Sequence, residues 1–264
     1  MKVKVIQILN IAGLILAIVV NYLANALPLA NKNTGEVSAL YDTLFAPAGF
    51  TFSIWGIIYL LLTVFVVYQS KGIFKAAGSK KIPSFYHRIG YWFFISCVAN
   101  ASWIFAWHYE VLWLSVVLMT ILLISLLQIY LRLGVGHRIV NHRERYFIHV
   151  PFSIYLGWIS VATIANVAAY LVSLRWDGFG ISPEIWTSVM ILVAAAIAVS
   201  ILITRRDLFF SLVILWAFFG IFMKRIGTDP QQSIIIILSL ASGGLVILSV
   251  IIFQSVKMFI QKIR

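Results

Sequence analysis

Residues 41–59 read YDTLFAPAGFTFSIWGIIY, from Tyr41 to Tyr59, and this stretch combines the start of an apolar helix with a row of aromatic residues. A polar segment gives way at Pro47 to an uninterrupted apolar run, which predicts a helix that starts at about Pro47. Proline fits a first helical turn because its missing N–H would have no partner there. Phe52, Trp55 and Tyr59 fall at i, i+3 and i+7, so their rings share one stripe of that helix. Such a stripe either packs against neighbouring helices or forms the wall of a site for a flat ligand.

Composition places the chain in a membrane. Hydrophobic residues make up 62% of the 264 residues, and the mean hydropathy is +1.01, which is too apolar for a soluble core. The net charge of +12 does not indicate a nucleic-acid-binding face, because the basic residues sit in short gaps between apolar runs. The single cysteine, Cys97, lies inside an apolar segment and so predicts neither a disulfide framework nor a cysteine metal cluster.

The apolar runs predict an all-α, polytopic integral membrane bundle with eight transmembrane helices. A span needs about 20 residues to cross a hydrocarbon layer of about 30 Å. Two alternatives stay open: the first segment as a cleavable signal peptide, and the sixth and seventh as a re-entrant pair. The predicted spans are residues 5–27, 48–69, 89–108, 111–131, 146–173, 184–203, 208–223 and 232–256.

The Lys and Arg residues predict the orientation. With both termini in the cytoplasm, the outer side keeps only Lys32, Arg175, Lys224 and Arg225, a strong positive-inside bias that an odd number of spans would spoil. The acidic residues gather on the outer side. We therefore expect a multi-pass protein of the plasma (inner) membrane. The basic residues assigned to the inner side are Lys2, Lys4, Lys71, Lys75, Lys80, Lys81, Arg88, Arg132, Arg138, Arg143, Arg145, Arg205, Arg206, Lys257, Lys262 and Arg264.

Amides and aromatic rings recur together on the predicted spans. Asn100, Trp103 and Trp107 share one face of the third span, and a second stripe follows the fifth span. Converging stripes would enclose a cavity with aromatic walls and a few orienting amides, although a solid aromatic core would give the same pattern. The predicted ligand-binding residues are Asn21, Phe52, Trp55, Tyr59, Asn100, Trp103, Trp107, Tyr155, Trp158, Ala162 and Asn166.

Three elements resemble the tryptophan-rich sensory protein, or translocator protein (TspO/MBR), family. The first is the loop and second helix, where Ala48 stands in place of a second proline and Phe50 in place of a frequent tryptophan. The second runs from Asn100 to Trp107 and resembles the family's Asn-Trp-x-Trp element. The third runs from Pro151 to Trp158, with Asn166 beyond it, and resembles the fifth-helix Pro-Tyr-Leu-x-Trp and Leu-Asn pattern. The matching residues of the first element are Leu44, Pro47, Phe50, Ile54, Trp55, Ile58 and Tyr59.

The resemblance covers residues 1–173 and implies a five-helix bundle, with residues 174–264 as a three-helix extension. It implies binding of a hydrophobic planar molecule, such as a porphyrin or haem, beneath the loop of residues 29–46, for sensing, sequestration or transport. That loop carries Asn31, Asn33 and Gly35, which favour a loop over a helix. The alternative is a permease-like or scaffold protein without a small-molecule pocket. Membrane lipid and the small molecule are the expected partners, and a homodimer stays open.

No pattern in the sequence indicates catalysis. We find no nucleophile elbow, no phosphate-binding loop and no dinucleotide glycine signature, and no catalytic residue is predicted. Light-dependent degradation of a bound porphyrin by tryptophan chemistry stays open. The spacing of His87, His137, His142 and His149 matches no metal motif, and no metal site is predicted. His108 lies beside Trp107 at the outer end of the third span, where a haem iron could reach it, but we assign it no ligand role.

Overall fold

A computed structural model of the chain describes residues 3–26, 29–41, 43–71, 73, 83–227 and 230–263, without the side chains of 230–232 and 258–263. The structure is 85% helical, with no strand in these ranges, which confirms the predicted all-α fold. The long helices are α1 (Val3–Ala26), α3 (Ile54–Ser70), α5 (Trp92–His108), α6 (Leu112–Leu133), α8 (Val150–Ser173), α9 (Pro183–Arg205), α10 (Leu208–Arg225) and α11 (Pro230–Ile263).

Short helical segments connect or extend the long helices. One of them, η3, is a π-turn that joins α7 to α8, so that residues 142–173 form one helical stretch. The short segments are η1 (Leu29–Asn31), α2 (Thr34–Leu40), η2 (Gly49–Ser53), α4 (Phe85–Ile89), α7 (His142–Glu144), η3 (Arg145–His149) and η4 (Gly178–Gly180).

Each of the eight predicted spans is a helix. Seven helical stretches in the described residues are long and apolar enough to cross a membrane. The remaining predicted span, residues 89–108, corresponds to α5, whose 17 residues stand at the lower limit of about 17 residues for a transmembrane helix. The helices α9 and α10, which could have formed a re-entrant pair, are each long enough to cross separately.

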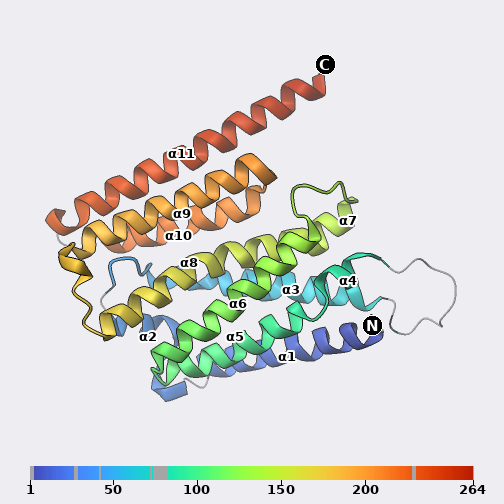
Figure 1. Ribbon diagram of the computed structural model, residues 1–264, viewed down its shortest axis with the longest axis horizontal. Helices are drawn as coiled ribbons and strands as arrows, with labels where there is room; N and C mark the ends of the chain where they lie inside the picture. The colour runs from blue at the N-terminus through green and yellow to red at the C-terminus, as the bar shows by residue number, and fades with distance from the viewer. Residues whose placement is uncertain are drawn as a thin grey trace.

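The helices are arranged in two groups that meet at α10 (Figure 1). In the first group α1 packs against α3 and α5, and α6 packs against α5 and α8. In the second group α9 packs against α11, and α10 contacts α8, α9 and α11. The first group is the predicted five-helix bundle and the second is the predicted extension. The division at residue 173 stays a prediction.

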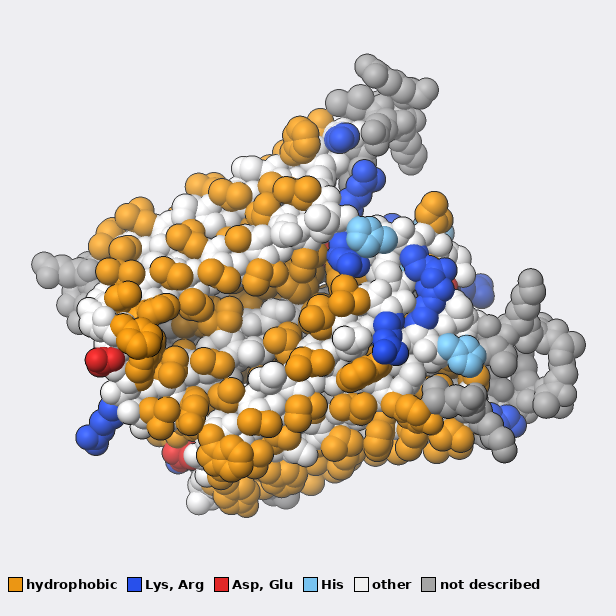
Figure 2. All heavy atoms as spheres, in the orientation of Figure 1, with side chains coloured by type: hydrophobic (Ala, Val, Ile, Leu, Met, Phe, Trp, Pro, Cys, Tyr) orange, Lys and Arg blue, Asp and Glu red, His pale blue; other side chains and the backbone are white. Residues whose placement is uncertain are grey.

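The two chain ends lie at the same end of the molecule, as an even number of spans requires (Figure 1). We call this the terminal end, and the end that carries α2 the lid end. Most Lys and Arg side chains visible in Figure 2 lie at the terminal end. Which end faces the cytoplasm stays a prediction. Several charged residues used for it fall outside the described side chains: Lys2, Asp42, Lys75, Lys80, Lys81, Asp229, Lys262 and Arg264.

The helix expected from about Pro47 begins at Gly49 with η2 and runs on through α3. The N–H of Ala48, just before η2, donates to the carbonyl of Gly220 in α10 (3.0 Å). One local prediction is wrong, because the segment expected as a loop contains α2. Asn33 accepts from the N–H groups of Gly35 and Glu36 (both 3.0 Å), and Glu36 accepts from the N–H of Asn33 (2.7 Å). This capping box starts a helix where single residues suggested a loop.

Candidate ligand pocket

A cavity of about 920 Å³ lies at the lid end between α1, α2 and the start of α3. We call it the lid pocket. Its wall combines four aromatic and three asparagine side chains with small residues, one acidic residue and one basic residue. The lining residues are Ile18, Asn21, Tyr22, Asn25, Asn33, Thr34, Gly35, Glu36, Ser38, Ala39, Pro47, Ala48, Gly49, Phe52, Trp55, Gly56, Tyr59 and Lys224.

Four of the predicted ligand-binding residues line this pocket: Asn21 of α1, Phe52 of η2, and Trp55 and Tyr59 of α3. Phe52, Trp55 and Tyr59 are only half-buried, as an accessible wall requires. The helical spacing that predicted one aromatic stripe is thus the arrangement that the structure places against the cavity.

Four more predicted residues form a buried layer behind that wall, centred on Trp55. The ring of Trp55 is stacked on Trp103, with centroids 6.1 Å apart and an angle of 28° between planes. Trp103 is stacked in turn on Trp107 (5.9 Å, 21°). Trp158 and Tyr155 meet Trp55 edge-on at 6.3 Å and 6.1 Å. Edge-on and offset contacts of this kind hold aromatic rings in place, so the wall ring Trp55 is rigidly supported.

A fully buried amide, Asn100, joins the polar atoms of the wall. Its Oδ1 accepts from Nδ2 of Asn21 (2.7 Å) and from the hydroxyl of Tyr59 (3.0 Å). These bonds fix two wall residues from different helices, α1 and α3, onto α5. The network gives the pocket a defined polar side, as ligand sites require.

Three buried N–H groups in this cluster have no hydrogen-bond partner among the described residues: Nδ2 of Asn100 and Nε1 of Trp103 and Trp158. A buried donor without an acceptor is costly, and such groups are uncommon. All three belong to residues that the sequence predicted as ligand-binding. The cluster therefore has spare donors for acceptor atoms of a water or a ligand.

The two remaining predicted residues lie elsewhere on α8. Asn166 is paired with Ser115 of α6, its Nδ2 donating to the hydroxyl (2.8 Å) and its Oδ1 accepting from the same group (3.1 Å). Ala162 is partly buried against the core and is not among the lining residues. Tyr155 and Asn166 both lie on α8, as predicted. About 16 Å of helix separates them, so they do not contribute to the same pocket.

The lid over the pocket is fastened at both ends of α2. Lys32, just before α2, forms an ion pair with Glu110 (2.7 Å), and Tyr41, just after it, donates to the other carboxylate oxygen (2.9 Å). Glu110 stands at the corner between α5 and α6. The bonds from Lys32 and then Tyr41 lower the pKa of Glu110, whereas burial and the neighbouring Glu110 raise the pKa of Tyr41 to about 12. A third bond runs from Nε1 of Trp107 to the carbonyl of Thr34 (3.2 Å).

Helix α10 holds the opposite rim of the pocket. Nε1 of Trp216 donates to the carbonyl of Thr51 (3.0 Å), in addition to the bond between Ala48 and Gly220. The ring of Phe50 meets Trp216 edge-on at 5.6 Å. The η2 turn that presents Phe52 is therefore attached to a helix that lies far along the chain, since Thr51 and Trp216 are 165 positions apart.

A second hollow, of about 630 Å³, lies between α8 and α9 with α10 beneath it. We call it the α8–α9 groove. Its lining is mainly apolar, with Trp176 and Trp186 near the η4 turn. It contains none of the predicted ligand-binding residues.

The described residues contain no group of three or more His, Cys, Asp or Glu side chains that could hold a metal ion. Cys97 is buried with a free thiol. His108 is fully buried, and its Nδ1 lies 2.8 Å from the carbonyl of Ile104.

Sequence reasoning did not identify several lining residues. The acid Glu36 belongs to a capping box that is visible in the sequence and could have revealed α2. The basic residue Lys224 could not have been found this way, because its position depends on how α10 packs against η2.

Comparison with known proteins gives one match. A family model described as TSPO-like protein matches residues 7–252, which include α9, α10 and most of α11. No curated protein and no solved structure matches the chain.

Proposed function

The chain belongs to the TSPO-like protein family, and from this premise we propose that it binds a flat, largely apolar small molecule of the porphyrin or haem kind in the lid pocket. Binding would serve sensing, sequestration or transport of that molecule. The observation that carries the proposal is the position of Trp55. Its ring lines the cavity and is backed by a stack of further indoles.

The size and chemistry of the pocket support a ligand of this class. Sites for small molecules commonly enclose about 300 to 1,000 Å³, with apolar and aromatic walls and few polar groups. The lid pocket has about 920 Å³ of space. A flat ring system could lie against Trp55 and Tyr59, whose own planes differ by only 18°.

The polar groups support a ligand that carries hydrogen-bond acceptors. Asn21 and Tyr59 are held in place by Asn100, and the cluster behind them has N–H donors without a partner among the described residues. Ring nitrogens or carbonyl oxygens of a flat ligand could use such donors, if side chains shift slightly as the ligand enters. No catalytic group is assigned, and the proposal is one of binding.

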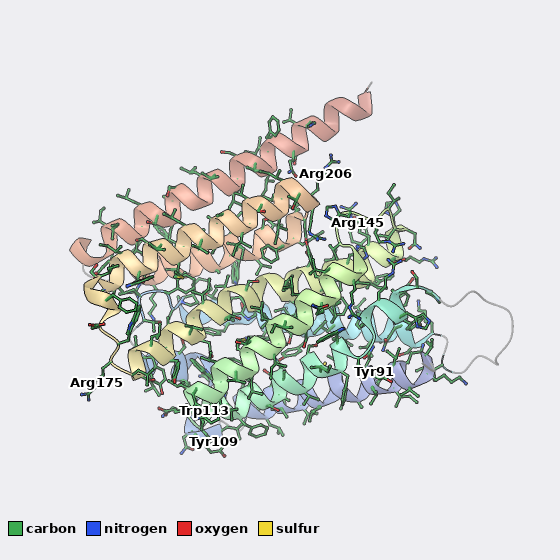
Figure 3. The ribbon with its side chains drawn as sticks, viewed as in Figure 1. Tyr91, Tyr109, Trp113, Arg145, Arg175 and Arg206 are labelled. Atoms are coloured by element: carbon green, nitrogen blue, oxygen red, sulfur yellow. The ribbon has the colours of Figure 1, made fainter. Side chains whose placement is uncertain are left out.

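Titration of the purified protein with protoporphyrin, followed by porphyrin absorbance, tests the proposal. We expect saturable binding that is about tenfold weaker in Trp55→Ala, because the variant loses a stacking surface. Trp113→Ala is the matched control: Trp113 on α6 is 58% exposed (Figure 3), and it is not among the residues that line the pocket. Unsaturable uptake, or equal weakening in both variants, would favour a scaffold protein.

A further inference from the structure

The lid pocket is not built by the five-helix bundle alone. Lys224, near the lid end of α10, is one of its lining residues and the only basic one among them. The other charged lining residue is Glu36, whose carboxylate accepts from the N–H of Asn33 within the capping box. The predicted extension thus adds a cationic group to a wall whose other charged residue is Glu36.

The position of Lys224 relative to the aromatic wall is fixed by close packing of α10 on η2. At Gly220, a Cβ atom would lie 2.7 Å from Cγ2 and 2.9 Å from Cβ of Thr51, closer than atoms can approach. Thr51 itself is fully buried. Because only glycine permits this approach, α10 packs directly against the residues that lead into Trp55.

A lysine in the wall of a cavity favours ligands that carry a negative charge. Its ammonium group has three donors, so it can serve a protein partner and a ligand together. A charge-assisted bond to a carboxylate is stronger than one between neutral groups, and it is screened less beside an apolar wall than in open water. The carboxylate of Glu36, in contrast, already accepts a hydrogen bond from the N–H of Asn33 at the start of α2.

We propose that the bound molecule carries an acidic group that pairs with Lys224 while its flat apolar body lies against Trp55. This assignment rests on the proposed function of the lid pocket and adds the ligand class to it: a planar acid rather than any planar hydrophobe. It also gives α10 a role, as the helix that supplies the charged end of the site.

Two probes of the same shape test this pairing in the full-length protein: protoporphyrin, which has two carboxylates, and its dimethyl ester, which has none. In Lys224→Gln we expect protoporphyrin to bind about five- to tenfold more weakly, whereas the affinity for the ester should not change. Lys224→Arg should retain most of the affinity for the acid. Arg175→Gln is the matched control, because it removes one exposed cation from the same end of the molecule without touching the pocket (Figure 3).

The outcomes distinguish the pairing with Lys224 from ligand binding in the lid pocket as such. Equal affinities of the wild type and Lys224→Gln for protoporphyrin would overturn the Lys224 pairing and leave the pocket proposal standing. The same would follow if Lys224→Gln weakened the acid and the ester equally, since that would indicate a role in shape rather than charge. If the wild type bound neither probe saturably, the proposed function would fail and this inference with it.

Discussion

The lid pocket and the α8–α9 groove differ in chemistry more than in size. Both border the segment between α2 and η2, since residues 43–45 line the groove and residues 47–49 line the pocket. The pocket has three asparagines, a lysine and a glutamate in its wall. The groove has one charged residue, Asp177, and no amide side chain; the rest of its lining is apolar apart from three threonines and a serine. Asparagine side chains, which form directional hydrogen bonds, line the lid pocket but not the α8–α9 groove.

This difference indicates that a hollow between membrane helices is not by itself a site for a specific ligand. The groove is bordered by two helices long enough to span the membrane, and lipid chains can fill such a surface without any polar partner. The lid pocket holds amides whose orientation is fixed by buried hydrogen bonds. A specific small molecule needs such fixed groups, so the two hollows should respond differently to mutation.

The largest effect should come from filling each hollow with an indole. Gly56 lines the lid pocket, and a Cβ atom there meets nothing within 4 Å, so Gly56→Trp should fold and occupy ligand space. We expect its affinity for protoporphyrin to fall at least tenfold, about 1.4 kcal/mol or more. Ala168→Trp, which fills the α8–α9 groove instead, should bind as the wild type does. Loss of binding in Ala168→Trp alone would reverse the comparison and make the groove the site.

A smaller effect should separate two asparagines that the sequence presents alike. Asn100→Ala removes the acceptor that holds Asn21 and Tyr59, so protoporphyrin binding should weaken about three- to tenfold. Asn166→Ala removes only the pair with Ser115. It should lower thermal stability, by about 0.6 kcal/mol for an average buried membrane hydrogen bond, and leave binding unchanged. Isothermal binding and thermal melting of both variants measure the contrast; equal losses of affinity would place Asn166 in the site.

The features predicted correctly from the sequence are those set by local periodicity. A 3.6-residue repeat fixes which residues share a helix face, so the aromatic stripe of Phe52, Trp55 and Tyr59 follows from their spacing alone. The eight helices follow from a second local signal, the length of the apolar runs. Periodicity gives the face of a helix but not the neighbour that it meets. For that reason Asn166, on the correct stripe, pairs with α6 instead of reaching the pocket.

Features that depend on contacts between distant segments could not be derived. The hydrogen bond from the N–H of Ala48 to the carbonyl of Gly220, which lie 172 positions apart, is one such contact. Lys224 enters the pocket through another, the packing of α10 on η2. The α2 helix is a different case. Its capping residues Asn33 and Glu36 are a local signal, and they could have been recognised at the correct spacing.

The smallest effect should be a pH dependence of ligand release from the lid pocket. It arises because the contacts of Glu110 fasten the lid. Interaction with Lys32 and Tyr41 lowers the pKa of Glu110 below its ordinary value of 4.5. A carboxyl group whose folded pKa is depressed stabilises the folded form above the unfolded pKa, and that stabilisation is lost as pH falls through the folded value. The fastening should therefore be complete at pH values above 4.5 and weaken below it. Tyr41, with its pKa raised to about 12, remains a protonated donor throughout.

Stopped-flow dissociation of protoporphyrin measures this fastening. In Glu110→Gln we expect release at neutral pH to be about twofold faster than in the wild type, a modest change because ion pairs as exposed as this one contribute little. Below the folded pKa the two proteins should release the ligand at the same rate, since the wild-type carboxyl group is then also uncharged. Acid also titrates the porphyrin, but this affects both proteins equally and cancels in their ratio. If the ratio stayed constant as the pH falls through the folded pKa of Glu110, this residue would not hold the lid closed through its charge. The fastened cover would then no longer distinguish the lid pocket from the α8–α9 groove.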